Sequence, residues 1–263
     1  MESSTLAHVL VAFFAAGTWI SLATLAGERL GAKAGGLVVN LPGNIVFSLL
    51  FVALTRGVGY ASLTATSTSV GMTIDTIFLV ALLAGMSRGL GVGIIAGFAG
   101  WLLSAALFFA LPAAGPLVGT GLYLVVCALS FLFADRFLRI RAVPKRPALF
   151  RPVVLGVRAL FAGTIVAAAV LIAQVAPPYL TGIAAVFPAT MVSTMVILSR
   201  AQGLAFARET GKILIVSSAN IVVYGLLVAG LYPLVGIGWG TFAAYAGAAL
   251  FVLAISPSVR RIL

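Results

Sequence analysis

The chain is dominated by apolar runs that are each about as long as a lipid bilayer is thick. A helix needs roughly 20 apolar residues to cross a hydrocarbon core of about 30 Å, because each residue advances the helix by about 1.5 Å. About nine such runs fall near residues 5–26, 35–54, 62–86, 89–111, 116–133, 153–175, 182–198, 211–231 and 236–255. In lipid, backbone polar groups must bond one another, so the runs predict an all-α polytopic membrane protein.

The composition leaves little material for a soluble domain. Hydrophobic residues make up 62% of the 263 residues and charged residues 8%, whereas soluble domains carry about 25% charged residues. The longest stretch without a membrane-length run lies between Phe133 and Val153 and is too short to fold alone. We therefore expect residues 1–263 to form a single membrane domain whose main partner is the lipid bilayer.

The basic residues predict the orientation of the chain. The net charge of +11 suits nucleic acid in principle, but the basic residues lie in short loops without interleaved aromatic residues, so we expect no nucleic-acid partner. With the N-terminus outside and the C-terminus cytoplasmic, 15 of the 16 Lys and Arg residues face the cytoplasm and only Arg56 faces outward. This bias predicts a multi-pass inner-membrane protein, with a basic cytoplasmic loop at about 134–152 lying on anionic lipid headgroups.

The two halves of the chain resemble each other. An ungapped alignment that places Gly17 over Gly163 gives six identities within 26 positions, and it ends with Pro42 over Pro188. After a slip in register, Leu-Leu-Ala-Gly at 82–85 meets Leu-Val-Ala-Gly at 227–230. The alternative is that helices rich in small residues resemble one another by composition alone.

The alignment predicts two four-helix repeats, at about 5–111 and 153–255, joined by a linker helix at about 116–133. A linker that crosses the membrane once makes the second repeat enter from the opposite side. The result is an inverted-topology repeat, an architecture typical of transport proteins.

One motif resembles a known family. Phe187-Pro188-Ala189-Thr190 is followed by an apolar run, then by Ser199-Arg200 and Gly203, and this pattern resembles the small GlpM-like integral membrane proteins. Their single unit has a proline-containing second helix and about four spans. Here the unit looks duplicated, with Leu41-Pro42-Gly43-Asn44 as the version in the first copy. The resemblance implies a tandem arrangement of four-span units, and it implies no established substrate.

Asp75 is the acidic residue that falls within a predicted span. A carboxylate at that depth costs roughly 2.5 to 3.5 kcal/mol on insertion scales, so it should face a cavity or a partner. On a helix, Thr68 and Gly71 lie on the same stripe as Asp75. The threonine hydroxyls either share a bound cation or bond the preceding backbone turn, and Asp75 itself is alternatively a protonated acid bonded to a neighbouring helix.

Pro42 and Pro188 each lie about a third of the way into a predicted span. A proline lacks an N–H and therefore breaks or kinks a helix. Asn44 and Thr190 follow the two prolines by two residues, so we expect polar side chains beside both breaks.

The duplication also pairs Asp75 with Asn220 and Thr73 with Ser218, which predicts polar groups at equivalent depths. Inverted-repeat transporters place their binding sites near the midplane at broken helices. Our candidate substrate- or ion-binding residues are Asn40, Asn44, Thr68, Thr73, Asp75, Thr190, Ser217, Ser218 and Asn220. The competing interpretation is that Asn, Ser and Thr side chains hold neighbouring helices together.

These features predict a transporter or channel for a small polar solute or ion, with Asp75 binding a cation or proton. The alternative is a non-catalytic accessory subunit of a cell-envelope lipid or polysaccharide complex. We do not expect an enzyme, because the candidate acids Glu28, Asp135 and Glu209 each lie beside an arginine and suggest local charge balance. The lone Cys127 and the lack of ligand motifs predict neither a metal site nor a cofactor. The sequence leaves the solute and the oligomeric state open.

Overall fold

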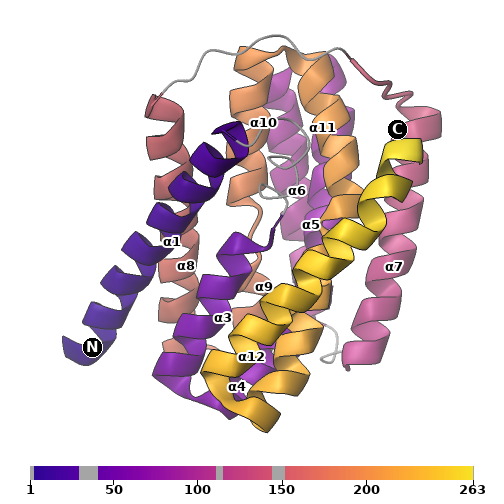
Figure 1. Ribbon diagram of the computed structural model, residues 1–263. Helices are drawn as coiled ribbons and strands as arrows, with labels where there is room; N and C mark the ends of the chain where they lie inside the picture. Colours follow the sequence, from indigo (N-terminus) through magenta and orange to yellow (C-terminus); the bar gives the residue numbers. More distant parts are fainter. Residues whose placement is uncertain (1–2, 30–40, 111–114, 144–151, 263) are drawn as a thin grey trace.

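The computed structural model describes residues 3–29, 41–110, 115–143 and 152–262, and every regular element in these ranges is helical (Figure 1). The all-α prediction is therefore confirmed for the described residues. Short 3-10 and π segments, Met86–Arg88 and Phe133–Phe137, follow α5 and α7. The α-helices are α1 (Ser3–Arg29), α3 (Gly43–Arg56), α4 (Val58–Thr66), α5 (Thr68–Gly85), α6 (Leu90–Ala110), α7 (Pro116–Leu132), α8 (Pro152–Val175), α9 (Pro178–Ala185), α10 (Ala189–Ala201), α11 (Leu204–Ser217) and α12 (Ala219–Ile262).

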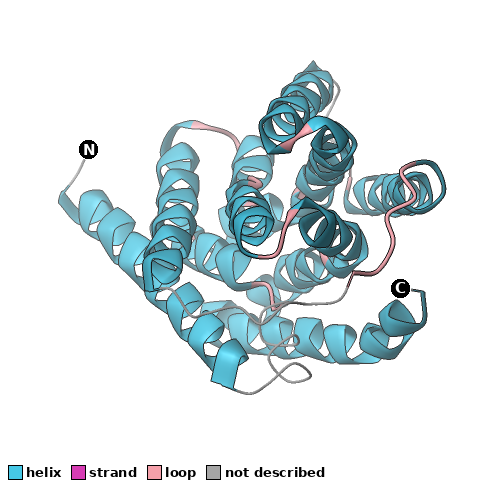
Figure 2. Ribbon diagram, turned by 90° about the horizontal axis from the view of Figure 1, so that it is seen from above, coloured by secondary structure: helices cyan, strands magenta, loops and turns pink. Residues whose placement is uncertain are grey.

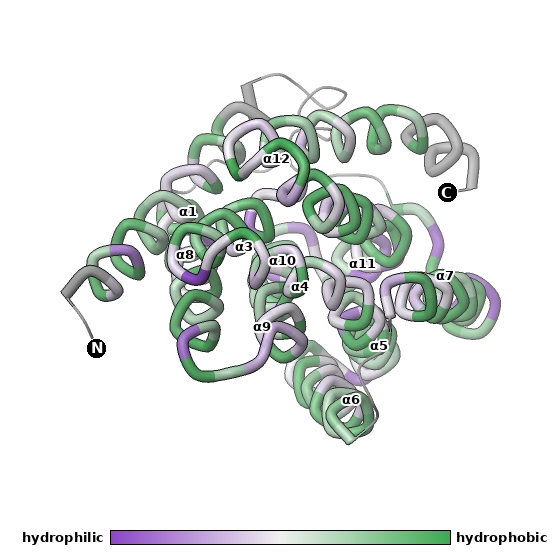
Figure 3. Tube along the Cα trace, turned by 90° about the horizontal axis from the view of Figure 1, so that it is seen from below, coloured by the Kyte–Doolittle hydropathy of each residue, from purple (hydrophilic) through white to green (hydrophobic). Residues whose placement is uncertain are grey.

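The outer surface of the helix bundle is apolar, as a membrane protein requires. Leu103 on α6 is 73% exposed and Leu117 on α7 is 87% exposed, and both helices are largely apolar along their length (Figure 3). Within the described residues, seven segments are long and apolar enough to cross a membrane, and α3 is a shorter apolar helix. The chain is therefore a multi-pass membrane protein.

The C-terminal helix α12 folds back on itself at Gly236. This glycine has φ 77° and ψ 177°, values that no α-helix contains. Across the bend, the Tyr232 hydroxyl lies 2.8 Å from Oγ1 of Thr241, and Gly247 packs against Leu227. Residues 204–255, which form one apolar segment by composition, therefore pass through the molecule twice.

Three predicted spans are broken rather than continuous. The span expected at 62–86 consists of α4 and α5, which meet at Ser67, and the span expected at 182–198 consists of α9 and α10, which meet at Phe187 and Pro188. The span expected at 211–231 is also wrong at its start, since α11 begins at Leu204 and gives way to α12 at Ser218.

The second predicted span, 35–54, is described only from residue 41 onward, and α3 begins directly after Pro42. Asn40 and residues 144–151 of the predicted basic loop lie outside the described residues.

Gly17 and Gly163, which the internal alignment pairs, both lie at a close contact between helices. Gly17 of α1 faces the backbone oxygen of Ala159, and Gly163 of α8 faces the backbone oxygen of Phe13. The helices α1 and α8 therefore pack against each other through equivalent positions. Viewed from above, α1 and the C-terminal part of α12 run obliquely along one edge of the bundle (Figure 2), where Trp19 and Tyr245 make an edge-to-face contact at 6.2 Å.

Candidate functional site

Pro42 and Pro188 form the same kind of tight turn in the two halves of the chain. The N–H of Gly43 donates to the carbonyl of Leu41 over 2.8 Å, and the N–H of Ala189 donates to the carbonyl of Phe187 over 2.9 Å. Each bond spans three residues with a proline at the centre, as in an inverse γ-turn. Because a proline suits the start of a helix and interrupts what precedes it, α3 and α10 begin directly after these turns.

The starts of α3 and α10 lie beside a small cavity of about 40 Å³. Figure 1 shows both helices beginning near the middle of the bundle rather than at its ends. The structure thus brings Asn44 and Thr190 together, although 146 residues separate them. The cavity is lined by Asn44, Ile45, Ala185, Val186, Phe187, Pro188, Thr190, Met191 and Ile221.

Two polar side chains of α3 each have a buried oxygen atom with no hydrogen-bond partner among the described residues. They are Asn44, through its Oδ1, and Ser48, through its Oγ. Ser48 is fully buried, and it lies one turn beyond Asn44 on the same helix face. The sequence analysis missed Ser48, because a serine inside an apolar run usually bonds its own helix.

Asp75 lies on α5, one turn beyond Gly71, and is 1% exposed. Its Oδ1 accepts a hydrogen bond from the indole N–H of Trp101 on α6 over 3.0 Å, and its Oδ2 has no partner among the described residues. A Cβ at Gly71 would overlap Val186, so α5 packs closely against the end of α9. Asp75 is thus held one helical turn from the α5–α9 contact, near the break between α9 and α10.

An aromatic contact separates Asp75 from the cavity wall. The Trp101 ring meets Phe187 edge to face, with centroids 5.0 Å apart, and Phe98 stacks on the other side of the same contact at 6.1 Å from Phe187. Phe187 also lines the cavity. Trp101 and Phe187 therefore connect the carboxyl group to the proline turn. The sequence did not indicate a role for either aromatic side chain.

Several other predicted site residues donate to backbone carbonyls three or four residues earlier in the chain. Thr68 donates to the carbonyl of Ala65 over 2.7 Å, Thr73 to Ser69 over 3.0 Å and Ser218 to Ile215 over 3.3 Å. These hydroxyls therefore fit the interpretation that they bond the preceding backbone turn rather than share a bound cation. Ser217 and Asn220 are also buried, and none of these residues lines the cavity between α3 and α10.

The linker helix α7 packs against broken helices of both halves. Oγ1 of Thr120 lies 3.1 Å from Oγ of Ser69, just after the break at Ser67. The Cys127 thiol donates to the carbonyl of Ile215 over 3.2 Å, just before the break at Ser218. Cys127 therefore connects α7 to the end of α11, in addition to packing against apolar side chains.

The acidic residues near the end of α7 and on α11 have partners far along the chain. Nζ of Lys212 lies 2.7 Å from Oδ1 of Asp135 and also donates to the carbonyl of Ile140. Glu209 accepts the backbone N–H of Val143 over 2.7 Å. Asp135 and Glu209 therefore connect α11 to residues 135–143, in addition to the local charge balance that the sequence suggests.

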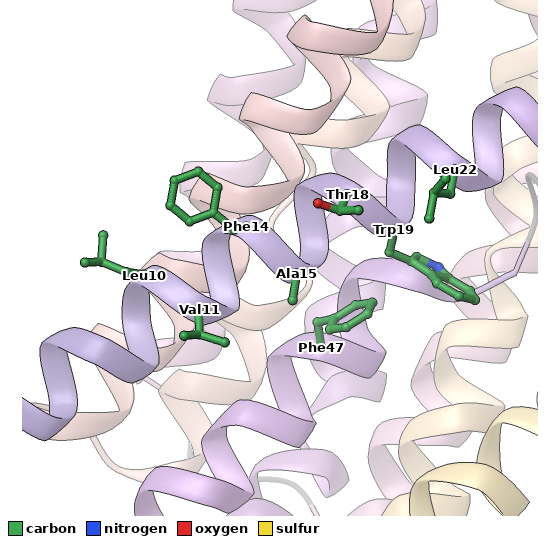
Figure 4. Close-up of a pocket in the computed structure, with 8 residues that line it drawn as sticks. All are labelled: Leu10, Val11, Phe14, Ala15, Thr18, Trp19, Leu22 and Phe47. Carbon is green, nitrogen blue, oxygen red and sulfur yellow. The ribbon is translucent and has the colours of Figure 1, made fainter.

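An open groove between α1 and α3 has a volume of about 510 Å³ (Figure 4). Its lining is apolar apart from the Thr18 hydroxyl and the Trp19 indole nitrogen. The remaining lining residues are Leu10, Val11, Phe14, Ala15, Leu22 and Phe47. Such a surface suits lipid chains rather than a polar solute.

No protein-family model matches the chain, and no curated protein or solved structure matches it either. The GlpM-like resemblance therefore stays a prediction. Within the described ranges, no group of three or more His, Cys, Asp and Glu side chains is placed to hold a metal ion.

Proposed function

We propose that the protein is a transporter or channel that moves a small polar solute or ion across the membrane. The observation that carries the proposal is the buried Asp75, whose Oδ2 has no partner among the described residues. An ionisable group at this depth is costly, and membrane proteins retain such groups mainly along ion and proton pathways. Its place beside the break between α9 and α10 adds a backbone feature that transport sites share.

The proposed architecture is a pair of inverted four-helix repeats with about nine crossings and α7 as the linker. Three pairs of backbone features support it. Gly203 follows Gly57 by 146 residues, as Pro188 follows Pro42, and both glycines adopt positive φ, 96° and 85°. Gly89 and Gly236 form a similar pair, with φ 128° and 77°. Equivalent turns at equivalent positions are what a duplicated fold would retain.

The proposed orientation follows from the ends of the helices. Arg56 ends α3, whereas Arg88, Arg136 and Arg200 lie at the other end of the bundle, near the C-terminus of α12 (Figure 1). Since positively charged loops stay in the cytoplasm, this end would face the cytoplasm and the N-terminus would face outward in the inner membrane.

In this mechanism Asp75 takes up the coupling cation or proton, and the solute occupies the neighbouring cavity. The proline turns allow α3 and α10 to move relative to the segments that precede them, because neither turn continues a helical hydrogen-bond ladder. Phe187, which lies between the cavity and Trp101, would transmit a change at Asp75 to the cavity wall. Ion binding at Asp75 would therefore be coupled to the solute cavity through the packed side chains of Trp101 and Phe187.

The test is flux through the purified full chain in proteoliposomes, with wild type and Asp75→Asn compared under proton, sodium, potassium and small-anion gradients. We expect flux in the wild type and its loss in the variant. Asp135→Asn is the matched control, because it removes a carboxylate whose side chain is 47% exposed and lies outside the candidate site. Equal flux in wild type and Asp75→Asn would exclude Asp75 from the mechanism. Absence of flux for every gradient would favour the accessory-subunit alternative.

A further inference from the structure

The cavity between α3 and α10 is lined by residues whose backbone N–H groups have no acceptor among the described residues. The first N–H groups of a helix lack partners within the helix. Here the N–H groups of Ile45, Thr190 and Met191 have no acceptor among the described residues, and neither helix has a side-chain cap. All three residues line the cavity. At the centre of a membrane domain, where water is scarce, such donors require a bound partner.

The charge of the site indicates what that partner is. Two helix N-termini add partial positive charge to the same small space, and this arrangement favours an anion. Proteins often neutralise helix N-termini with Asp or Glu, but the first turns of α3 and α10 contain no acidic residue. No acidic side chain lines the cavity. The donors are therefore left available for a negatively charged ligand.

The side chains provide a second, independent indication of a ligand. Ser48 is fully buried and its Oγ has no hydrogen-bond partner among the described residues. Helical side chains incline toward the N-terminus of their helix, so Ser48 leans toward Asn44 and the cavity. Asn44 lines the cavity, its buried Oδ1 has no partner among the described residues, and a rotation about its terminal bond exchanges the positions of the carbonyl and NH₂ groups. Ser48 and Asn44 can therefore both donate to a bound anion.

We propose that this cavity binds a small inorganic anion, of the size of a halide, between the N-termini of α3 and α10. The volume of about 40 Å³ holds a few water-sized groups, which suits a halide better than a sugar, an amino acid or an organic phosphate. The donors on opposite sides come from Ile45 and Asn44 on α3 and from Thr190 and Met191 on α10. The inference deepens the proposed transport function, because it names the solute as the anion and leaves Asp75 as the group that carries the coupled proton.

The sharpest variant is Asn44→Asp, which places a carboxylate where the anion would bind. The carboxylate is stabilised by the same helix N-termini, so it should occupy the site without lowering the melting temperature. Isothermal titration of the detergent-purified full chain with sodium bromide, against sodium gluconate at constant ionic strength, measures binding. We expect saturable bromide binding in the wild type and at least about tenfold weaker binding in Asn44→Asp.

Thr190→Val keeps the shape of the side chain and removes a hydroxyl next to the free N–H groups, so a smaller loss of bromide affinity is expected. Gly59→Ala is the control, since Gly59 lies on α4 with open space around its Cα, and its bromide affinity should equal that of the wild type. Wild-type affinity in Asn44→Asp would overturn the anion site, because a resident carboxylate and a bound halide cannot share it.

Binding and flux together separate this inference from the proposed function. Bromide binding that Asn44→Asp abolishes, together with bromide flux, supports both. Cation or proton flux without bromide binding would overturn the anion site and leave the transport proposal standing. Bromide binding without flux of any ion would retain the anion site and overturn the transport proposal. Absence of both would overturn both.

Discussion

The indole N–H of Trp101 donates a hydrogen bond to Oδ1 of Asp75 over 3.0 Å, from α6 to α5. Among the described residues, this bond is the polar contact of a carboxyl group that is 1% exposed. Trp101 therefore both orients Asp75 and, through its edge-to-face contact with Phe187, sets the position of the carboxyl relative to the break between α9 and α10. The effects of replacing Trp101 and Asp75 on stability should therefore be coupled.

Replacing Trp101 with Phe should weaken the protein mainly through Asp75. The variant retains an aromatic ring but leaves a buried carboxyl without its donor, which costs about 1 to 3 kcal/mol. In Asp75→Leu, which has no acceptor for the indole N–H, the same replacement should cost less. A double-mutant cycle in sodium dodecyl sulfate unfolding measures the difference, and a coupling free energy near zero would show that the hydrogen bond does not contribute.

Gly182→Ala should destabilise the break in α4–α5. A Cβ at Gly182 would overlap the carbonyl oxygen of Thr64 and lie 2.7 Å from Cβ of Ser67, and overpacking of this kind costs about 1 to 3 kcal/mol. The control is Gly230→Ala on α12, where no heavy atom lies within 4 Å, and where the change should be within about 1 kcal/mol of zero. Unfolding in mixed micelles measures both. Equal stability of the two variants would contradict the close approach of α9 to α4.

The apolar runs and the prolines were sufficient to predict much of the fold. Length and hydropathy define segments such as Leu90–Ala110 and Pro152–Val175 closely, because lipid exposure requires continuous apolar residues. Pro42 and Pro188 predict helix breaks because neither residue has a backbone N–H to donate to the preceding turn. The position of Asn44 and Thr190 beside one cavity then follows from their equal spacing after the two prolines.

The breaks at Ser67 and Ser218 could not be predicted in the same way. Neither position has a proline or a glycine, and the breaks depend on neighbours distant in sequence, such as Gly182 against Ser67 and Cys127 against Ile215. The pairing of Asp75 with Trp101 likewise depends on which faces of α5 and α6 meet. Periodicity does not determine that choice in helices that are apolar on every side.

Lys212→Met should loosen residues 137–143 from α11. Lys212 is 4% exposed, and its ammonium group bonds both Asp135 and the carbonyl of Ile140. Methionine fills a similar volume without donating, so both acceptors lose a partner. Hydrogen–deuterium exchange should become several-fold faster across residues 137–143. Arg88→Met, at an exposed position, is the control, and unchanged exchange in Lys212→Met would show that Glu209 alone holds this segment.

Accessibility of single cysteines should place the two ends of the bundle on opposite sides of the membrane. The Tyr60 hydroxyl donates to the carbonyl of Ala176 over 2.6 Å, so the start of α4 and the end of α8 lie at the same end.

Cysteines at Gly59 and Val175, both exposed, should therefore react with an impermeant maleimide from outside, and cysteines at the exposed Ser87 and Ala201 from the cytoplasm. Cys127→Ser is the background, because serine keeps a donor for the carbonyl of Ile215. Labelling of all four positions from one side would contradict the nine-span topology, and with it the inverted repeat, since the second repeat is inverted only if α7 crosses the membrane.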